Sequence, residues 1–251
     1  MTVSRIRTLA SSTAACLAML AALTACGGGG ADSGFTPTAA AGLYEVTGGS
    51  TPAFEILMLD TGRLYALYGL NPTTPVPAGG VIVGDVSTTG GTFAATTVHD
   101  FNLVAHTVSS GMASGTFVAK TSISGTATTS AATSPFGGTY STTYDQAANL
   151  STLAGNYGGE TADLGGTKVS VVTVNTAGLI AGSSTTGCAY AGVATPHATG
   201  NVFDVTMTYQ AGCTENGNTL RGHAFVSHNV LYIVTLNGDQ SRAVVFAGVK
   251  S

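Results

Sequence analysis

Apolar and polar residues alternate in the second half of the chain with the period of a β-strand. Residues 202–209 show this most clearly, because every second position is apolar. The apolar positions are Phe203, Val205, Met207 and Tyr209, and the polar positions between them are Asp204, Thr206 and Thr208. Successive side chains of a strand point to opposite faces, so the pattern predicts a half-buried strand.

Turn residues separate runs of this kind at short intervals. Asn237-Gly238-Asp239 lies between the apolar runs 229–236 and 242–248. Asn-Gly favours a hairpin because both residues accept a positive φ. Residues 196–200 form another predicted turn. Together the runs and turns predict about eight short strands between residues 156 and 248, a spacing typical of a small barrel or sandwich.

The first half of the chain has a weaker pattern. Residues 64–68, 81–86 and 116–120 are predicted strands, and the Ser/Thr/Ala-rich segment 122–135 fits a loop or an edge strand. A short helix is predicted over 145–153, ended by a glycine. The predicted fold class is therefore all-β, with antiparallel meander units in tandem.

Two segments resemble each other, which predicts an internal duplication. Ala41-Gly42-Leu43-Tyr44 opens one segment, and Ala154-Gly155-Asn156-Tyr157 opens the other. An apolar run and a glycine-containing turn follow each opening, at 60–62 and at 175–178. We therefore predict an N-terminal β unit at 42–145 and a C-terminal β unit at 150–251.

The first 25 residues have the organisation of an export signal. Arg5 and Arg7 precede an apolar stretch at 9–23, which is short for a membrane-spanning helix. The following Leu23-Thr24-Ala25-Cys26 resembles a bacterial lipobox. This resemblance implies a lipoprotein signal peptide at 1–25, which is cleaved, and a lipid such as palmitate on Cys26.

A glycine-rich segment follows the lipobox. Residues 26–41 include four consecutive glycines after Cys26 and a proline at position 37, so we predict a lipidated flexible tether. In lipoproteins of the enterobacterial type, an Asp after the lipidated cysteine is the inner-membrane retention signal. Gly27 stands there instead, which favours the outer membrane.

Composition narrows the classes of function. Only 8% of residues are charged, the formal net charge is −4, and there are 35 glycines and no Trp. Thr, Ser and Gly must therefore supply the polar surface, which suits strands better than long surface helices. The chain has no basic patch to bind nucleic acid.

The four cysteines divide into two groups. Cys16 leaves with the signal peptide and Cys26 carries the lipid, so Cys188 and Cys213 remain in an oxidising compartment. We predict a disulfide between them. Metal binding is the rival interpretation, but these cysteines have neither CxxC spacing nor a nearby histidine pair.

The second half is similar to a group of uncharacterised small lipoproteins of Gram-negative bacteria. The segments that carry this resemblance are Gly155-Asn156-Tyr157, 187–192, 201–206 and 246–250. The resemblance implies a β fold and a place in the cell envelope. It implies no activity, so no functional residue follows from it.

Catalytic and cofactor motifs are absent from the sequence. There is no GxSxG, no P-loop and no GxGxxG after a strand, so we predict neither catalytic residues nor a cofactor.

The histidines are expected to lie scattered on the surface without a metal site; they are His99, His106, His197, His223 and His228. Glu45 and Glu160 could form a glycosidase-like pair or be strand-edge residues. The tyrosines at 65, 68, 140 and 144 could form a binding surface or belong to the core.

These observations predict a lipid-anchored cell-envelope protein with a non-catalytic β domain that binds a partner or has a structural role. The expected partners are the membrane, through the lipid, and a protein or small ligand at a sheet edge or barrel mouth. The alternative is a divergent envelope hydrolase whose site the sequence does not reveal.

Overall fold

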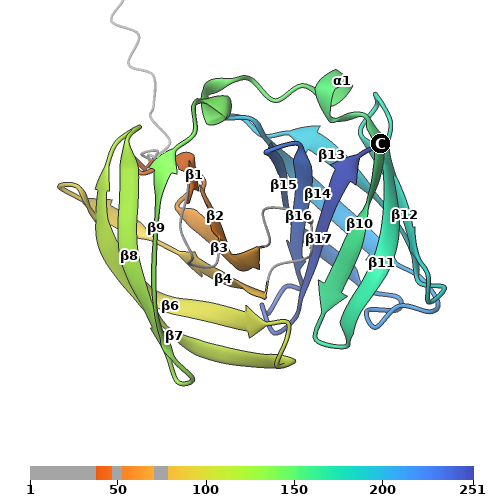
Figure 1. Ribbon diagram of the computed structural model, residues 1–251, viewed down its shortest axis with the longest axis horizontal. Helices are drawn as coiled ribbons and strands as arrows, with labels where there is room; N and C mark the ends of the chain where they lie inside the picture. Colours follow the sequence, from red (N-terminus) through yellow and green to blue (C-terminus); the bar gives the residue numbers. More distant parts are fainter. Residues whose placement is uncertain (1–37, 47–52, 71–78) are drawn as a thin grey trace, which may run out of the picture. The chain divides into compact units, whose positions relative to one another are not determined.

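The computed structural model describes residues 38–46, 53–70 and 79–251 (Figure 1). The predicted signal peptide, the lipidation site Cys26 and the tether up to residue 37 lie outside the described residues. Within the described ranges, no helix has both the length and the apolar character needed to cross a membrane.

The first half of the chain forms an eight-stranded antiparallel barrel, barrel 1. Its strands are β1 (Gly42–Glu45), β2 (Ala53–Met58), β3 (Arg63–Leu70), β4 (Gly80–Asp85), β6 (Thr92–Asn102), β7 (Thr107–Val118), β8 (Ser122–Thr129) and β9 (Thr133–Tyr140). Pairing of β4 with β6 and of β1 with β9 closes the barrel. The short β5 (Ser87–Thr89) pairs with β6.

The second half forms another closed antiparallel barrel, barrel 2, in which each strand pairs with the next (Figure 1). Its strands are β10 (Gly155–Asp163), β11 (Gly166–Val174), β12 (Leu179–Ser184), β13 (Ala189–Pro196), β14 (Val202–Tyr209), β15 (Thr219–Ser227), β16 (Val230–Leu236) and β17 (Ala243–Lys250). The prediction of an all-β chain with two tandem antiparallel units is confirmed, and both units are barrels rather than sandwiches.

A short connection joins the barrels, where one helix at 145–153 was predicted. It contains a 3₁₀ turn, η1 (Thr142–Asp145), and a single helical turn, α1 (Leu150–Leu153). The Asn149 side chain accepts a hydrogen bond from the Ser151 amide and so caps the N-terminus of α1.

Among the residues that the structure describes, three apolar cores stabilise the fold. One fills barrel 1, around Tyr44, Ile56 and Phe93, and a second fills barrel 2, around Tyr157 and Phe203. The third core lies between the barrels and takes residues from the outer faces of both. Its members include Leu43, Leu57, Leu67, Val83 and Phe101 of barrel 1 and Phe225, Tyr232, Val234, Val245 and Ala247 of barrel 2.

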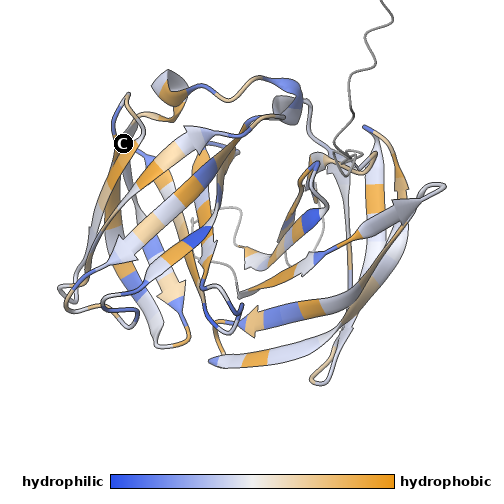
Figure 2. Cartoon of the chain, turned by 180° about the vertical axis from the view of Figure 1, so that it is seen from behind, coloured by the Kyte–Doolittle hydropathy of each residue, from blue (hydrophilic) through white to orange (hydrophobic). Residues whose placement is uncertain are grey.

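This third core explains why some strands lack alternation. Strands that are buried on both faces read as continuous apolar runs. In β16 six of the seven residues are buried, and in β17 the first six are buried. No residue of β7 belongs to this core, and along β7 exposed residues alternate with partly or fully buried ones. Figure 2 shows hydrophobic and hydrophilic residues as bands of colour along the strands of both barrels.

Both barrels repeat the same structural details, which supports the predicted duplication. The Tyr44 hydroxyl donates to the Ala40 carbonyl at 2.8 Å, and the Tyr157 hydroxyl donates to the Leu153 carbonyl at 2.6 Å. Each tyrosine therefore ties the start of its barrel to the residue four positions earlier.

The predicted turn glycines are also equivalent. Gly62 and Gly178 have φ of +85° and +79°, a conformation that favours glycine. Each glycine carbonyl accepts a backbone hydrogen bond from the end of the following hairpin, from Val86 and Ala194 respectively. A side chain at either glycine would meet a carbonyl oxygen of that same residue.

Four local predictions need correction. Residues 38–41, assigned to the tether, form a turn whose Ala40 is buried in the core of barrel 1. Residues 122–135, predicted as a loop or an edge strand, contain β8 and the start of β9, and β8 is paired on both sides rather than at an edge. The strand predicted at 116–120 ends at Val118, and Lys120 lies in a turn. After β16, the positive φ falls on Gln240 rather than on the Asn-Gly pair.

Candidate functional site

A pocket of about 350 Å³ lies where the two barrels meet. Barrel 1 contributes Arg63 and Tyr65 of β3, and barrel 2 contributes residues of β15 and of the β16–β17 hairpin. The barrel 2 residues are Thr219, Arg221, Gly222, His223, Leu236, Asn237, Gly238 and Gln240. Most of the lining residues have polar side chains, and neither barrel forms the pocket alone.

Positive charge is concentrated in this pocket. Two of the three arginines that follow the predicted leader line it, in a chain with only eight Lys and Arg residues. The Arg63 guanidinium pairs with Asp85 at 2.9 Å and donates to the Gln240 side-chain oxygen at 3.1 Å. Arg221 donates to the Thr206 hydroxyl and has no carboxylate partner among the described residues. Its charge is therefore free to attract an anion.

A chain of hydrogen bonds connects Tyr65 and His223, which line this pocket, to Asp60. The Tyr65 hydroxyl lies 2.8 Å from Nδ1 of His223, and Nε2 of His223 lies 3.2 Å from Oδ1 of Asp204. The same Asp204 oxygen is 2.7 Å from Nδ1 of His197, whose Nε2 is 3.0 Å from Asp60. The chain of contacts thus begins and ends in barrel 1 and passes through barrel 2.

Strand register brings these groups together. Asp204 of β14 lies directly opposite His223 of β15, with both side chains on the outer face of barrel 2. His197 follows β13 and returns to Asp204, whereas Asp60 follows β2 in barrel 1. The expectation that the histidines lie scattered on the surface is therefore wrong for His197 and His223.

The pKa values of the two histidines are shifted in opposite directions. Burial lowers the pKa of His223 to about 4, although the nearby Asp204 opposes this shift. His223 is therefore neutral at pH 7, and burial keeps the neighbouring Tyr65 protonated by raising its pKa. Burial also disfavours the charge of His197, but hydrogen bonds to Asp60 and Asp204 outweigh it and raise the pKa of His197.

A second polar cluster joins the barrels through Ser227, at the end of β15. Its hydroxyl oxygen lies 3.0 Å from Glu45, 3.1 Å from Glu55 and 3.0 Å from Nδ1 of His228. One hydroxyl carries one proton, so it cannot donate to both carboxylates. Burial, and then the charge of Glu45, raise the pKa of Glu55 to about 8. Glu55 is therefore mostly protonated at pH 7.

Of the two alternatives for Glu45 and Glu160, the structure favours separate strand residues, in β1 and β10, over a carboxylate pair. Glu45 follows Tyr44 by one position, whereas Glu160 follows Tyr157 by three, so the two do not occupy equivalent positions. The cross-strand partner of Glu45 is Glu55. Of the four tyrosines considered as a binding surface, Tyr65 and Tyr144 are buried, and Tyr68 and Tyr140 are partly buried against the barrel 1 core.

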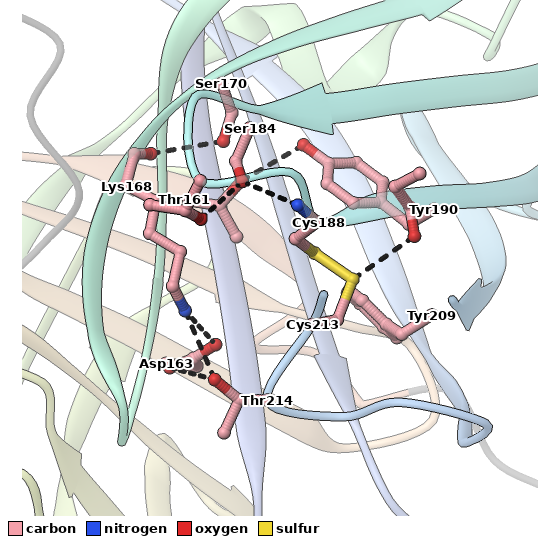
Figure 3. Close-up of a disulfide and its surroundings, with 12 residues drawn as sticks. Thr161, Asp163, Lys168, Ser170, Ser184, Cys188, Tyr190, Tyr209, Cys213 and Thr214 are labelled. Carbon is pink, nitrogen blue, oxygen red and sulfur yellow. Dashed lines mark hydrogen bonds and ion pairs between the residues drawn. A yellow bond between two sulfur atoms is a disulfide. The ribbon is translucent and has the colours of Figure 1, made fainter. Parts of the chain in front are cut away.

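The predicted disulfide is present in barrel 2 (Figure 3). Cys188, just before β13, is bonded to Cys213 in the loop between β14 and β15. Beside it, Lys168 pairs with Asp163 at 3.1 Å, and the Tyr190 hydroxyl contacts Thr161 inside the barrel. The disulfide therefore fixes the β14–β15 loop against the end of β12 and the start of β13.

A cavity of about 460 Å³ in barrel 1 is the rival site. Phe54 and Phe136 line it together with glycines and hydroxyl residues of β7, β8 and β9, and none of its lining residues is charged. Few of its groups could fix the orientation of a ligand, so the junction pocket is the stronger candidate.

No pattern in the sequence indicates that Arg63 and Arg221 share a pocket, because they lie in different barrels. Comparison of the chain with protein-family models, with curated proteins and with solved structures found no match.

Proposed function

We propose that this chain is a lipid-anchored protein of the bacterial cell envelope that binds a small anionic ligand in the junction pocket without transforming it. The export signal and the lipobox at Cys26 support the location. The disulfide between Cys188 and Cys213 fits an oxidising compartment such as the periplasm or the cell surface.

One observation carries the binding function: Arg63 and Arg221 from the two barrels line one small pocket. Guanidinium groups suit carboxylates and phosphates because their donors match these anions in geometry. Tyr65, Asn237 and Gln240 add uncharged polar groups that could orient a ligand. The volume lies near the lower end of the usual range for ligand pockets, about 300–1,000 Å³, which favours a small metabolite.

Ser227 and His228 are the residues that most resemble a hydrolase site, and their geometry favours a structural role. Ser227 is only 2% exposed, so a substrate could not reach its hydroxyl. Nδ1 of His228 contacts this hydroxyl, but the same hydroxyl also faces two carboxylates. These contacts support a structural role for Ser227 rather than nucleophilic catalysis.

The test is calorimetric titration of the purified protein with a panel of small carboxylates and phosphates. We expect at least one to bind and Arg221→Gln to weaken that binding by about 10-fold or more, as expected for a charge-assisted contact. Lys120→Gln is the matched control, because it removes one exposed positive charge in barrel 1. Equal weakening in both variants, or no binding by any member of the panel, would contradict the proposal.

A further inference from the structure

Three potential metal ligands converge behind the junction pocket. Nitrogens of His197 and His223 and a carboxylate oxygen of Asp204 all lie within 4.8 Å of one another. The Asp204 oxygen is 2.7 Å from Nδ1 of His197 and 3.2 Å from Nε2 of His223. The two imidazole rings are nearly perpendicular, at 85°, with their centroids 5.6 Å apart.

These spacings resemble those of a four-coordinate metal site. Zn²⁺ binds imidazole nitrogens and carboxylate oxygens at about 2.0–2.1 Å, which places neighbouring ligand atoms of a tetrahedron about 3.3 Å apart. The two oxygen–nitrogen distances, 2.7 and 3.2 Å, lie close to this value, so small shifts of the side chains would admit an ion in place of the protons between them. Two nitrogens and one oxygen suit Zn²⁺ and similar transition metals better than Ca²⁺ or Mg²⁺.

The outer nitrogens of both histidines already have hydrogen-bond partners. Nε2 of His197 contacts the Asp60 carboxylate at 3.0 Å, and Nδ1 of His223 contacts the Tyr65 hydroxyl at 2.8 Å. Histidines that bind a metal usually make such a second contact, which fixes the ring and its tautomer. Asp60 and Tyr65 belong to barrel 1, whereas all three ligands belong to barrel 2.

Burial and charge also suit a bound cation. The side chains of His197 and His223 are 12% and 18% exposed, whereas that of Asp204 is 48% exposed. The rings are therefore held by packing, and the carboxylate leaves a path to solvent and room for a fourth ligand. Asp60 and Asp204 together supply two negative charges, and the nearby Arg63 is paired with Asp85.

We propose that His197, Asp204 and His223 bind one divalent transition-metal ion of the Zn²⁺ class, with water as the fourth ligand. Asp60 and Tyr65 act as positioning residues, so metal binding strengthens the contact between the barrels. The site does not depend on anion binding in the junction pocket, although the two sites share His223.

The experiment is titration with Zn²⁺ alone of EDTA-treated protein that carries Cys16→Ser and Cys26→Ser, so that no cysteine outside the disulfide can bind the ion. We expect one ion per chain. His197→Gln and His223→Gln should each weaken binding at least 100-fold, and Asp60→Asn should weaken it about 10- to 100-fold. His106→Gln is the matched control, because His106 is exposed on the β6–β7 turn and should leave binding unchanged.

Co²⁺ provides a spectroscopic readout of the same site. We expect a visible absorption band of a four-coordinate ion, which Asp204→Asn and His223→Gln abolish. Asp204 is half exposed, so its variant tests the site even where a buried histidine variant fails to fold. Unchanged Zn²⁺ affinity in folded variants of the three ligands would overturn the proposal. So would a protein that binds Zn²⁺ no more tightly than a variant in which His197, Asp204 and His223 are all replaced. Arg221→Gln leaves all three ligands in place, so the metal and anion sites can fail separately.

Discussion

Glu55 makes the stability of the folded chain dependent on pH in a direction that can be predicted. Its pKa is raised from 4.5 to about 8, first by burial and then by the charge of Glu45. The folded state therefore holds a proton that the unfolded state has lost between these two values. The corresponding stability is fully present below pH 4.5 and is lost as the pH rises through 8.

The magnitude follows from the size of the shift. One pKa unit corresponds to 1.36 kcal/mol, so the raised pKa of Glu55 lowers the free energy of unfolding, relative to its value below pH 4.5, by about 3 kcal/mol at pH 7 and about 5 kcal/mol at pH 9. Glu55→Gln keeps the shape of the protonated acid, and its amide oxygen can still accept the hydrogen bond from the Ser227 hydroxyl. The variant should therefore match the original protein at pH 4 and become more stable by these amounts as the pH rises.

Urea unfolding followed by circular dichroism at pH 4, 7 and 9 measures this difference directly. A difference between variant and original that stays constant across the pH range would refute the reasoning. Glu45→Gln provides a second check, because removing the neighbouring charge lowers the pKa of Glu55. That variant should lose less stability than the original protein between pH 5 and pH 9.

Three further perturbations test the fold. Reduction of the Cys188–Cys213 disulfide, which closes a loop of 25 residues, should lower the free energy of unfolding by about 3–4 kcal/mol in urea titrations with and without reductant. Tyr44→Phe and Tyr157→Phe should each cost about 1–2 kcal/mol, because each leaves one buried carbonyl without its donor; a large inequality would argue against equivalent roles. Phe225→Ala should cost about 3–5 kcal/mol by opening a cavity between the barrels, and a cost below 1 kcal/mol would contradict the shared core.

Local patterns in the sequence were sufficient to predict the fold class. In β14 the residues predicted to share a face with Phe203 are buried, and Thr208 on the other face is exposed. The repeated Gly-Leu-Tyr and Gly-Asn-Tyr openings likewise mark the first strand of each barrel. Both signals depend on residues close together in the chain, which is why they could be recognised without a structure.

The packing of one barrel against the other could not be predicted in this way. The run Val230–Leu236 shows that a strand is buried on both faces, but not what covers its outer face. The site depends on the same long-range packing. Asp60 and His197 are 137 positions apart, and Tyr65 and His223 are 158 positions apart.

The register between neighbouring strands could not be predicted from the sequence either. Alternation places Asp204 and His223 on the outer face of their strands, but their pairing depends on the loop between β14 and β15. That loop contains Cys213 and is too long for its conformation to follow from turn residues alone. Histidines that seemed unrelated in the sequence are therefore neighbours in the barrel.

The central claim is that the chain is a lipid-anchored envelope protein, and intact-mass spectrometry of the protein extracted from cell membranes tests it most directly. The account predicts a chain that starts at Cys26 and is heavier than the peptide by a diacylglyceryl group and an amide-linked acyl chain. It also predicts that Cys26→Ser abolishes this added mass. A mature chain without lipid, or one that still carries residues 1–25, would contradict the claim.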